Sequence, residues 1–349
     1  MSIEKLAPFF APTYENFPKG RTIGLVVLRT SLSELILRTE GTGEPMCREF
    51  VAAGLSEEGR KQVVQRLVMT KRKQVAPERR YGREHLRAYD LLYTIKKKEE
   101  ILTRSLNTNA PCEMCVDCFL YGFAAGGGGA QKSRLWTEDA FSLLPASDTI
   151  DDRTLNGVYE NGTMRLKKND SEDKASQSLN TSEYIKPGVH FLDIVTLKDV
   201  TADEFRYVVG NILLTSRYGA VSSRVGRMEN QILGIFGGIA ELPSSLELVQ
   251  TLHDEFLASS TPMEHPLDRN SLIKVTKEAI SSWSTRRGIS IQLSEEELVA
   301  AIADIDQNWS DAERENFLKR LDSSYEPFRH ASEPKKGKNK KKETAEVVN

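Results

Sequence analysis

Apolar residues recur along this chain at spacings that predict both strands and helices. Residues 21–32 have a β-branched apolar centre between arginines, which predicts a buried strand with charged ends. Residues 55–74 and 82–102 carry apolar side chains at helical spacing, so we expect two helices with basic outer faces. Residues 188–197 are largely apolar again and predict a second buried strand.

A helix is expected over residues 201–219, directly after this second strand. Thr201 and Glu204 match the capping-box pattern at its start, and Gly219 stands where a helix is expected to end. A strand, a short turn and a capped helix make half of an α/β sandwich. We therefore predict a mixed α+β fold.

The C-terminal part, residues 240–330, is predicted to be mostly helical. Its three expected helices cover residues 244–259, 269–287 and 294–309, and the last of them starts with a second capping box. No repeat of 20 to 50 residues is visible, which excludes a solenoid.

Two segments are too polar to form part of a core. Residues 155–185 hold an Asn-Gly pair between short strand-like segments, which predicts a protruding hairpin with a Ser-, Asp- and Asn-rich tip. Residues 331–349 include six lysines and almost nothing apolar, so we expect a disordered tail. The tail either attracts nucleic acid without specificity or serves solubility alone.

The composition is that of a soluble globular protein. The 349 residues are 39% hydrophobic and 28% charged, and no apolar run approaches the roughly 20 residues needed to cross a bilayer. We expect no membrane contact and a cytoplasmic location. The length suits one large domain with insertions or two ordinary domains, and we expect residues 1–330 to form a single core with insertions.

The net charge of −2 hides a strong segregation of charge along the chain. Residues 60–104 contain fourteen Lys and Arg against five Asp and Glu, whereas residues 289–326 contain ten acids against three bases. This asymmetry suits head-to-tail self-assembly around a nucleic acid, and solvated helix faces are the alternative. The basic segment and the cysteines described next lie within about residues 45–135, where we expect a basic helical and zinc-binding insertion.

Three of the four cysteines lie within seven positions, as Cys112, Cys115 and Cys118. So tight a cluster, with so few other cysteines, favours a thiolate metal site over disulfides, and zinc before other metals. A structural zinc ion needs a fourth ligand, for which the spacing leaves Cys47 or His85 open. An iron–sulfur cluster and the absence of any metal are the alternatives.

Four consecutive glycines, residues 126–129, follow the cysteines and precede Lys132 and Arg134. Their spacing does not match a phosphate-binding P-loop, which argues against a nucleotide triphosphatase. Glycines do let backbone N–H groups approach a ligand closely, so this loop and its two cations are a candidate contact for a phosphate chain. A flexible linker is the alternative.

A second basic loop spans residues 217–227. Its hydroxyls, guanidinium groups and glycines are a candidate contact for phosphates and bases, with one tyrosine available for stacking. The candidate RNA-binding residues in this loop are Arg217, Tyr218, Ser222, Ser223, Arg224 and Arg227. Helix capping with solvated arginines is the alternative. Further candidates near the first strand and in the basic region are Lys19, Arg21, Arg29, Lys71, Arg72, Arg79 and Arg80.

A catalytic constellation is hard to find in this sequence. No nucleophile or zinc-protease motif occurs, and His253 and His265 are expected in satisfied structural or surface roles. Asp151 and Asp152 precede the predicted hairpin and are candidate ligands of a divalent ion for phosphodiester cleavage. A metal-dependent nuclease is therefore the alternative to a binding protein. A zinc-ribbon DNA-binding regulator is a third hypothesis.

Taken together, the first strand, the cysteine cluster with its glycines, the hairpin and the loop at 217–227 resemble a known family. They are similar to the backbone subunit of type I-D CRISPR surveillance (Cascade) complexes, which belongs to the repeat-associated RNA-binding superfamily. The resemblance spans the chain to about residue 290. It implies a modified RNA-recognition-motif (RRM), ferredoxin-like core with inserted zinc-binding, helical and thumb-like hairpin subdomains.

The resemblance also implies a function. Several copies stack along one CRISPR RNA beside other Cascade subunits, and a target DNA strand pairs with the guide alongside. Lys19, Arg21, Arg29 and residues 217–227 match positions where the family holds RNA, and residues 155–185 match its thumb. The expected protein is a non-catalytic RNA-binding scaffold in antiviral defence, which reads phosphate charge and shape while base pairing reads sequence.

Overall fold

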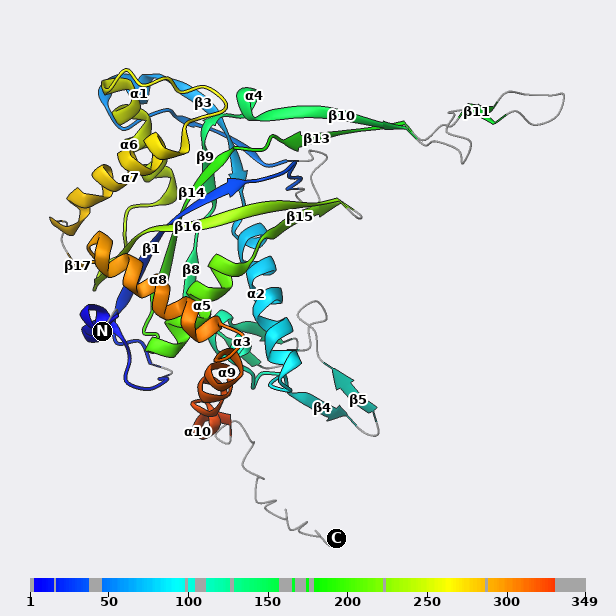
Figure 1. Cartoon of the computed structure of the whole chain (residues 1–349), viewed down its shortest axis with the longest axis vertical. Helices are drawn as coiled ribbons and strands as arrows, with labels where there is room; N and C mark the ends of the chain where they lie inside the picture. The colour runs from blue at the N-terminus through cyan, green and yellow to red at the C-terminus, as the bar shows by residue number, and fades with distance from the viewer. Residues whose placement is uncertain are drawn as a thin grey trace, which may run out of the picture.

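One large antiparallel sheet carries the fold, with helices on both of its faces (Figure 1). The computed structural model describes residues 3–15, 17–37, 46–97, 100–103, 111–125, 129–156, 165–166, 174–175, 179–221, 224–285 and 288–329. The strands of the sheet are β1 (Thr22–Ser31), β2 (Arg48–Ala52), β3 (Val63–Met69), β8 (Leu135–Thr137), β9 (Ala140–Pro145), β14 (His190–Lys198), β15 (Arg217–Val221), β16 (Arg224–Gly238) and β17 (Ile289–Gln292). They run in the order β15-β16-β1-β14-β9-β3-β2, with β17 paired to β16 and β8 paired to β14.

The two central strands, β1 and β14, confirm the predicted buried strands. Every residue of β1 is buried, and so is every residue of β14 except the last. Alternate side chains enter two different cores, because successive residues of a strand point to opposite faces. Leu25 and Val27 pack on one face, and Val26 and Leu28 pack on the other.

Helices cover both faces of this sheet. One core contains residues of α2 (Lys71–Ala88), α3 (Val116–Tyr121), α5 (Ala202–Leu214), α8 (Glu295–Trp309) and α9 (Arg314–Ser323). The opposite core contains residues of α6 (Ser245–Ala258) and α7 (Arg269–Ser281). The short helices are η1 (Glu4–Phe9), α1 (Glu57–Lys61), α4 (Ala146–Thr149), η2 (Ser282–Thr285) and α10 (Glu326–Arg329). Among the described residues, no helix is both long and apolar enough to cross a membrane.

Side-chain caps set the start of several helices. The capping box predicted at Thr201 and Glu204 is present at the start of α5. The box predicted for the helix over 294–309 is also present, where Ser294 caps α8. The helices expected over 244–259 and 269–287 are confirmed as α6 and α7, so the mixed α+β prediction holds.

Among the described residues, four small two-stranded ribbons lie outside the main sheet. They are β4 (Thr94–Lys97) with β5 (Glu100–Thr103), β6 (Phe123–Ala125) with β7 (Gly129–Gln131), β10 (Ile150–Asn156) with β13 (Leu179–Ile185), and β11 (Arg165–Leu166) with β12 (Lys174–Ala175). The β10–β13 ribbon is the hairpin expected over residues 155–185, but it starts earlier in the chain. The tail at 331–349 lies outside the described residues.

Three local predictions are wrong. Residues 55–74 form the short helix α1 and the strand β3 instead of one helix, because β3 pairs with both β2 and β9. Helix α2 ends at Ala88, and residues 94–103 form the β4–β5 ribbon in place of the helix expected over 82–102. Gly219 does not end a helix, because α5 stops at Leu214 and Gly219 lies within β15. For residues 63–69, pairing with the distant strand β9 therefore overrides the local helical spacing, whereas at 94–103 and 217–221 each strand pairs with the next strand in the chain.

The predicted domain boundaries remain predictions. Within residues 45–135, β2 and β3 belong to the main sheet and α2 belongs to the helical layer on it.

Candidate nucleic-acid interface and metal site

Two hairpins, β10–β13 and β15–β16, project to the same side of the molecule (Figure 1). The segment that follows β1 joins them. Leu35 and Ile185 of β13 exchange two main-chain hydrogen bonds, of 3.1 and 2.8 Å. On its other side the segment binds Arg227 of β16, whose N–H donates to Ser33 Oγ at 2.9 Å and whose carbonyl accepts from the Leu32 N–H at 2.8 Å. The roots of the two hairpins are thus held together.

Two glycines of the β15–β16 hairpin permit this close packing. Gly219 has a φ of +60°, and a Cβ there would lie 2.3 Å from the carbonyl oxygen of Ile36. A Cβ at Gly226 would lie 2.6 Å from Leu35 Cδ1 and 2.9 Å from the carbonyl oxygen of Glu34. Only glycine fits such distances without a shift of the backbone. These glycines therefore serve the contact between the hairpin and the segment after β1.

Arg217 and Arg227 lie directly opposite each other on β15 and β16. Both side chains are exposed, and Arg217 Nη1 donates to the carbonyl oxygen of Val225 at 3.2 Å. Neither arginine forms an ion pair with a carboxylate among the described residues. Like charges in directly opposite positions repel each other, so this pair is stabilised when an anion lies between or beside the two guanidinium groups. The root of the hairpin is therefore a candidate phosphate contact.

A buried polar network lies beneath this hairpin. Arg29 of β1 donates through Nε to Asp193 Oδ2 at 2.9 Å and through Nη1 to Glu78 Oε1 at 2.7 Å. The Tyr218 hydroxyl donates to Glu78 Oε1 at 3.1 Å and accepts from Asn230 Nδ2 at 2.8 Å. Arg29 Nη1 also donates to Asn230 Oδ1 at 3.1 Å. The network joins β1, β14, α2, β15 and β16 at one point, and so fixes the root of the hairpin.

Arg29 and Tyr218 are corrections to the predicted RNA contacts. Both side chains are fully buried, so neither reaches a ligand on the surface. Burial alone would lower the pKa of Arg29, but the carboxylates of Glu78 and Asp193 outweigh it and raise that pKa. The sequence did not single out Glu78, Asp193 or Asn230, and a buried cation with two carboxylates is a structural brace.

Arg134 is a further correction. It is buried, its Nη1 donates to the carbonyl oxygen of Asp199 at 2.6 Å, and its Nη2 donates to the carbonyl oxygen of Glu15. Its guanidinium carbon lies 4.0 Å from the ring centroid of Tyr14. Arg134 therefore anchors the N-terminal segment. Its neighbour Lys132 is exposed.

Lys19 and Arg21 lie at the opposite end of β1 from the hairpin. Their main-chain N–H groups donate to the two carboxylate oxygens of Asp199, each at 3.0 Å. Lys19 Nζ also lies 3.5 Å from a carboxylate oxygen of Glu15. Since β1 has ten residues and a strand rises about 3.3 Å per residue, roughly 30 Å separate these cations from Arg227.

The candidates on α2 form a third group. Lys71, Arg72 and Arg80 are exposed, whereas Arg79 is held by Asp117 through two hydrogen bonds, of 3.0 and 2.8 Å. A groove of about 520 Å³ lies beside this helix and is lined by Lys71, Arg72, Arg79 and the half-exposed Trp136, among others. The structure thus divides the predicted cations among three places. Ser222 and Ser223 lie outside the described residues, as does the side chain of Arg224.

Cys112, Cys115 and Cys118 form a buried group next to α2. Their sulfur atoms lie within 4.8 Å of one another, and the Cys112 and Cys118 sulfurs are 3.7 Å apart. Zinc–sulfur bonds of about 2.3 Å at tetrahedral angles place two sulfurs about 3.8 Å apart, so this spacing fits a zinc ion. Hydrogen bonds from the thiols of Cys115 and Cys118 lower the pKa of Cys112.

Neither predicted fourth ligand belongs to this group in the described part of the chain. The main-chain carbonyl of Cys47 accepts from the N–H of Val68 in β3 at 3.0 Å. The ring of His85 packs on Trp309, with 5.6 Å between centroids. Burial and the Arg314 charge lower the pKa of His85. The prediction of Cys47 or His85 as the fourth ligand is therefore corrected, because neither lies within the group of ligand atoms that the three thiols form.

Asp151 and Asp152, the candidate nuclease ligands, are successive residues of β10. Both are exposed, and the Asp151 carboxylate accepts from the N–H of Asp152 at 2.8 Å. Successive residues of a strand point to opposite faces, so the two carboxylates diverge. Among the described residues, the three cysteines are the only group of His, Cys, Asp or Glu with metal-binding geometry.

Comparison with known proteins identifies the family. Residues 9–318 match the model described as "Csc2 Crispr". The crystal structure of Thermofilum pendens Csc2 is 18% identical, has a TM-score of 0.58, and is matched over 94% of this chain and 98% of that chain, which shows a shared fold. A chain of a "CRISPR RNA-guided surveillance complex" is 9% identical over 82% of this chain and 99% of its own, at a TM-score of 0.46 that carries no argument. No curated protein matches. The chain belongs to the Csc2 CRISPR family.

Proposed function

We propose that this chain is a non-catalytic scaffold of a type I-D surveillance complex, in which several copies hold one CRISPR RNA by its phosphates. The observation that carries the proposal is the arginine pair of the β15–β16 hairpin. Two exposed guanidinium groups face each other without a carboxylate of the described residues, on a root that a buried network fixes. A rigid, uncompensated pair of cations suits a phosphate backbone, which carries one charge per nucleotide.

The arrangement of the sheet supports an RRM-like core. The order β16-β1-β14-β9, with α2 and α5 packed on one face, is the order that a ferredoxin-like β-α-β-β-α-β core requires. The proposed thumb is the β10–β13 ribbon, whose root is joined to that of the β15–β16 hairpin by the segment after β1. Target DNA paired to the guide and other Cascade subunits are the proposed partners, and the proposed location is the cytoplasm.

We also propose that the three cysteines hold a structural zinc ion. A structural zinc site has four protein ligands, so a fourth ligand beside the three cysteines would close the site to a reacting water. Zinc would then supply no chemistry beyond fixing the loop. Arg83 Nη1 lies 3.7 Å from the Cys115 sulfur and 3.3 Å from Asp117, and so offsets the negative charge of the thiolates. The loop is thereby tied to α2.

Elemental analysis of the purified chain tests the zinc proposal. We expect one zinc per chain in the wild type, loss of zinc in Cys115→Ser, and no change in Cys47→Ser or His85→Ala. Zinc content that persists in Cys115→Ser would contradict the site.

Two measurements test the RNA-binding function. Purification from the native host should recover short RNAs of one length class with a common repeat-derived end. In addition, Arg217→Ala with Arg227→Ala should weaken binding to single-stranded RNA by about tenfold for any sequence, and reduce the salt slope by about 1.4, which is roughly 0.7 per lost phosphate contact.

The matched control removes two other surface cations, by Lys274→Ala and Lys319→Ala, whose side chains are 77% and 54% exposed. This control should leave the salt slope unchanged. Equal slopes in the wild type and the hairpin variant would show that the arginine pair does not bind phosphate.

A further inference from the structure

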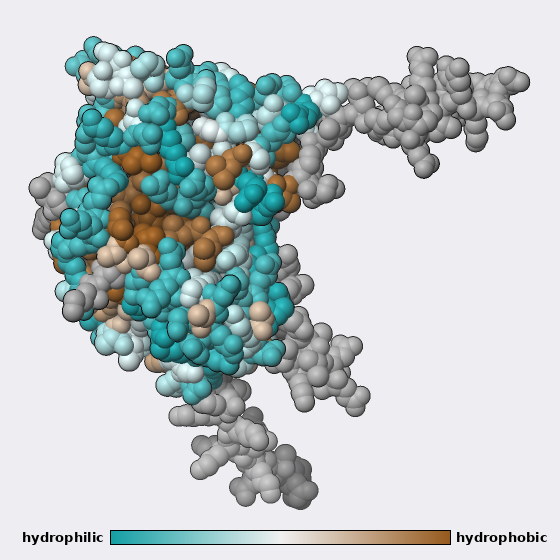
Figure 2. All heavy atoms as spheres, in the orientation of Figure 1, coloured by the Kyte–Doolittle hydropathy of each residue, from teal (hydrophilic) through white to brown (hydrophobic). Residues whose placement is uncertain are grey.

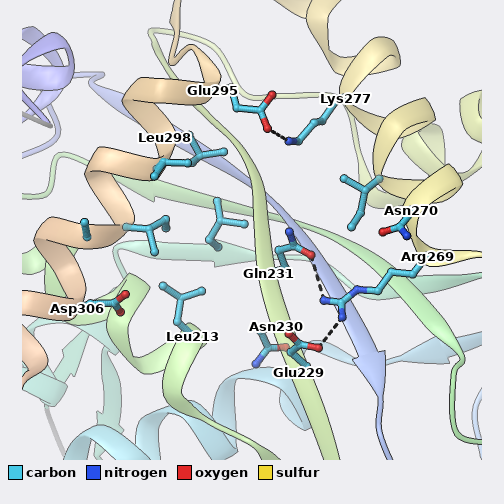
Figure 3. A pocket seen from close by; sticks show the side chains of 15 residues that line it. Leu213, Glu229, Asn230, Gln231, Arg269, Asn270, Lys277, Glu295, Leu298 and Asp306 are labelled. Atoms are coloured by element: carbon cyan, nitrogen blue, oxygen red, sulfur yellow. Dashed lines mark hydrogen bonds and ion pairs between the residues drawn. The ribbon is translucent and has the colours of Figure 1, made fainter.

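An apolar groove crosses the face of the molecule shown in Figure 2. It has a volume of about 710 Å³ and lies between α7 and α8. Its apolar lining comprises Leu213, Ile232, Ile273, Leu298, Val299 and Ile302. Figure 2 shows a hydrophobic patch here with hydrophilic residues around it, and Figure 3 shows the lining at close range. Neither the RNA contacts nor the zinc site proposed above involves this groove.

The floor of the groove is an open edge of the main sheet. On one side β16 pairs with β1 along ten residue pairs. On the other side β15 pairs with β16 no further than Arg227, and β17 pairs with it only from Phe236. Among the described residues, no strand pairs with this outer edge over residues 229–234. An open edge presents main-chain N–H and C=O groups, and its natural occupant is an extended polypeptide.

The two helix layers give such an occupant a place for its side chains. Ile232 belongs to the same core as α8, while Glu229 and Gln231 point to α7, where Arg269 binds them at 2.7 and 3.0 Å (Figure 3). An added strand would therefore lie between α7 and α8. Its alternate side chains would meet Ile273 on one side and α8 on the other.

The charges of the groove favour a basic occupant. Arg269 is paired with Glu229, and Lys277 forms an ion pair with Glu295 across the groove (Figure 3). Asp306 lines the groove as well and forms no ion pair within the described residues. The wall formed by α8 also belongs to the acidic segment at 289–326. A basic, extended segment with an apolar residue thus complements this surface.

We propose that the groove takes strand β4 of a second copy of this chain, which adds to the open edge of β16. The β4 sequence, Thr-Ile-Lys-Lys, combines β-branched residues with two cations, and it lies in the basic segment at 60–104. The β4–β5 ribbon projects from the body and pairs only with itself among the described residues (Figure 1). A lone two-stranded ribbon is marginally stable, so it gains by joining a larger sheet.

The groove and β4 are different surfaces of the chain, so the contact is head-to-tail and repeats from copy to copy. The inference rests on the proposed function in one respect, namely that several copies occupy one RNA. It adds the surface through which neighbouring copies meet.

Binding to RNA of two lengths tests this contact. The variant is Val299→Arg with Asp306→Lys, both in the groove; Val299 is 64% exposed, so the fold is preserved. We expect the wild type to fill a long RNA cooperatively, with at least tenfold tighter binding next to an occupied site. The variant should lose this factor and keep its affinity for a short RNA that holds one copy.

Two further variants sharpen the test. Glu296→Lys makes the same charge change as Asp306→Lys alone, on α8 but outside the groove lining, and should remain cooperative. Lys96→Glu with Lys97→Glu should lose cooperativity as the groove variant does, and the two sets combined should restore part of it by exchanging the charges. Unchanged cooperativity in the groove variant, or non-cooperative binding of the wild type, would overturn the proposal.

A disulfide trap tests the contact without RNA. Val299→Cys and Lys97→Cys chains are prepared separately and mixed under mild oxidation. We expect a linked dimer only in the mixture, with each variant alone and the wild type as controls. Absence of that dimer overturns the contact, whereas failure of wild-type RNA binding with the dimer present would overturn the proposed function alone.

Discussion

Arg29 and Arg227 belong to neighbouring strands of one sheet, and yet they have opposite roles. Arg29 is fully buried and is bound by two carboxylates, Glu78 and Asp193. Arg227 is exposed and lies opposite another arginine, with no carboxylate partner among the described residues. The residue type is the same, so the difference comes from burial and from the partners that the fold supplies.

This comparison separates cations that hold the fold from cations that are available to a ligand. A buried guanidinium must be paired, since an unpaired buried charge is very costly. An exposed guanidinium without a carboxylate keeps its charge for a phosphate. The buried group stabilises the root of the hairpin on which the exposed pair is displayed.

The largest expected effect comes from Arg29→Ala. This change leaves Glu78 and Asp193 buried without their cation, and we expect a loss of about 3–5 kcal/mol in the free energy of unfolding. Chemical denaturation measures it. A loss below about 1 kcal/mol would mean that the network does not brace the hairpin.

His190 is a second buried basic side chain, and unlike Arg29 it has no carboxylate partner among the described residues. Burial, together with the nearby charge of Arg269, lowers the pKa of His190 from 6.5 to about 4. Between pH 6.5 and pH 4, His190 is protonated in the unfolded chain but neutral in the folded chain. The free energy of unfolding is therefore highest above pH 6.5 and falls as the pH drops towards 4.

The free energy of unfolding is expected to fall by about 3 kcal/mol over this pH range, at about 1.4 kcal/mol per pH unit. Unfolding measured at pH 7, 6, 5 and 4 checks it, and His190→Gln should remove this part of the pH dependence. A wild type and variant with the same slope would contradict the assigned role.

Much of the secondary structure could be predicted, whereas the roles of the arginines could not. Long apolar runs predicted β1 and β14, and local capping patterns predicted α5 and α8, because those signals lie within a few residues of one another. The cysteine group was predicted for the same reason. The partners of Arg29 are 49 and 164 residues away in sequence, so no local pattern announces its burial.

The misread stretch at 63–69 has a similar cause. Its apolar residues fit a helical spacing, but β2 and β9 supply strand partners on both sides, and β9 lies more than 70 residues further along the chain. The fourth ligand of the proposed zinc site and the separation of the cations into three groups also depend on the fold. Spacing in the sequence carries no information about such distances.

A smaller effect on RNA binding is expected at the other end of β1. Lys19→Ala with Arg21→Ala should weaken RNA binding by only about twofold, because Lys19 already interacts with Glu15 and lies far from the arginine pair. The measurement is a titration with single-stranded RNA, beside the Arg217→Ala, Arg227→Ala variant. An equal loss of RNA affinity in both variants would contradict this expectation, because it would mean that both ends of β1 contact the RNA.

The smallest expected effect is a gain. Arg227→Ala removes one of two opposed like charges, and we expect the free energy of unfolding in the absence of RNA to rise by a few tenths of a kcal/mol. High salt should shrink this gain, since screening weakens the repulsion between exposed charges. A clear loss of stability would show that Arg227 has a partner that holds the hairpin.

Ultraviolet crosslinking of the intact complex with its RNA, followed by peptide mapping, shows directly whether the β15–β16 hairpin contacts the RNA. We expect crosslinked peptides to come chiefly from the β15–β16 hairpin and the adjoining root of β10–β13. Crosslinks confined to the N-terminal end of β1 or to α2, with none in the hairpin, would contradict it.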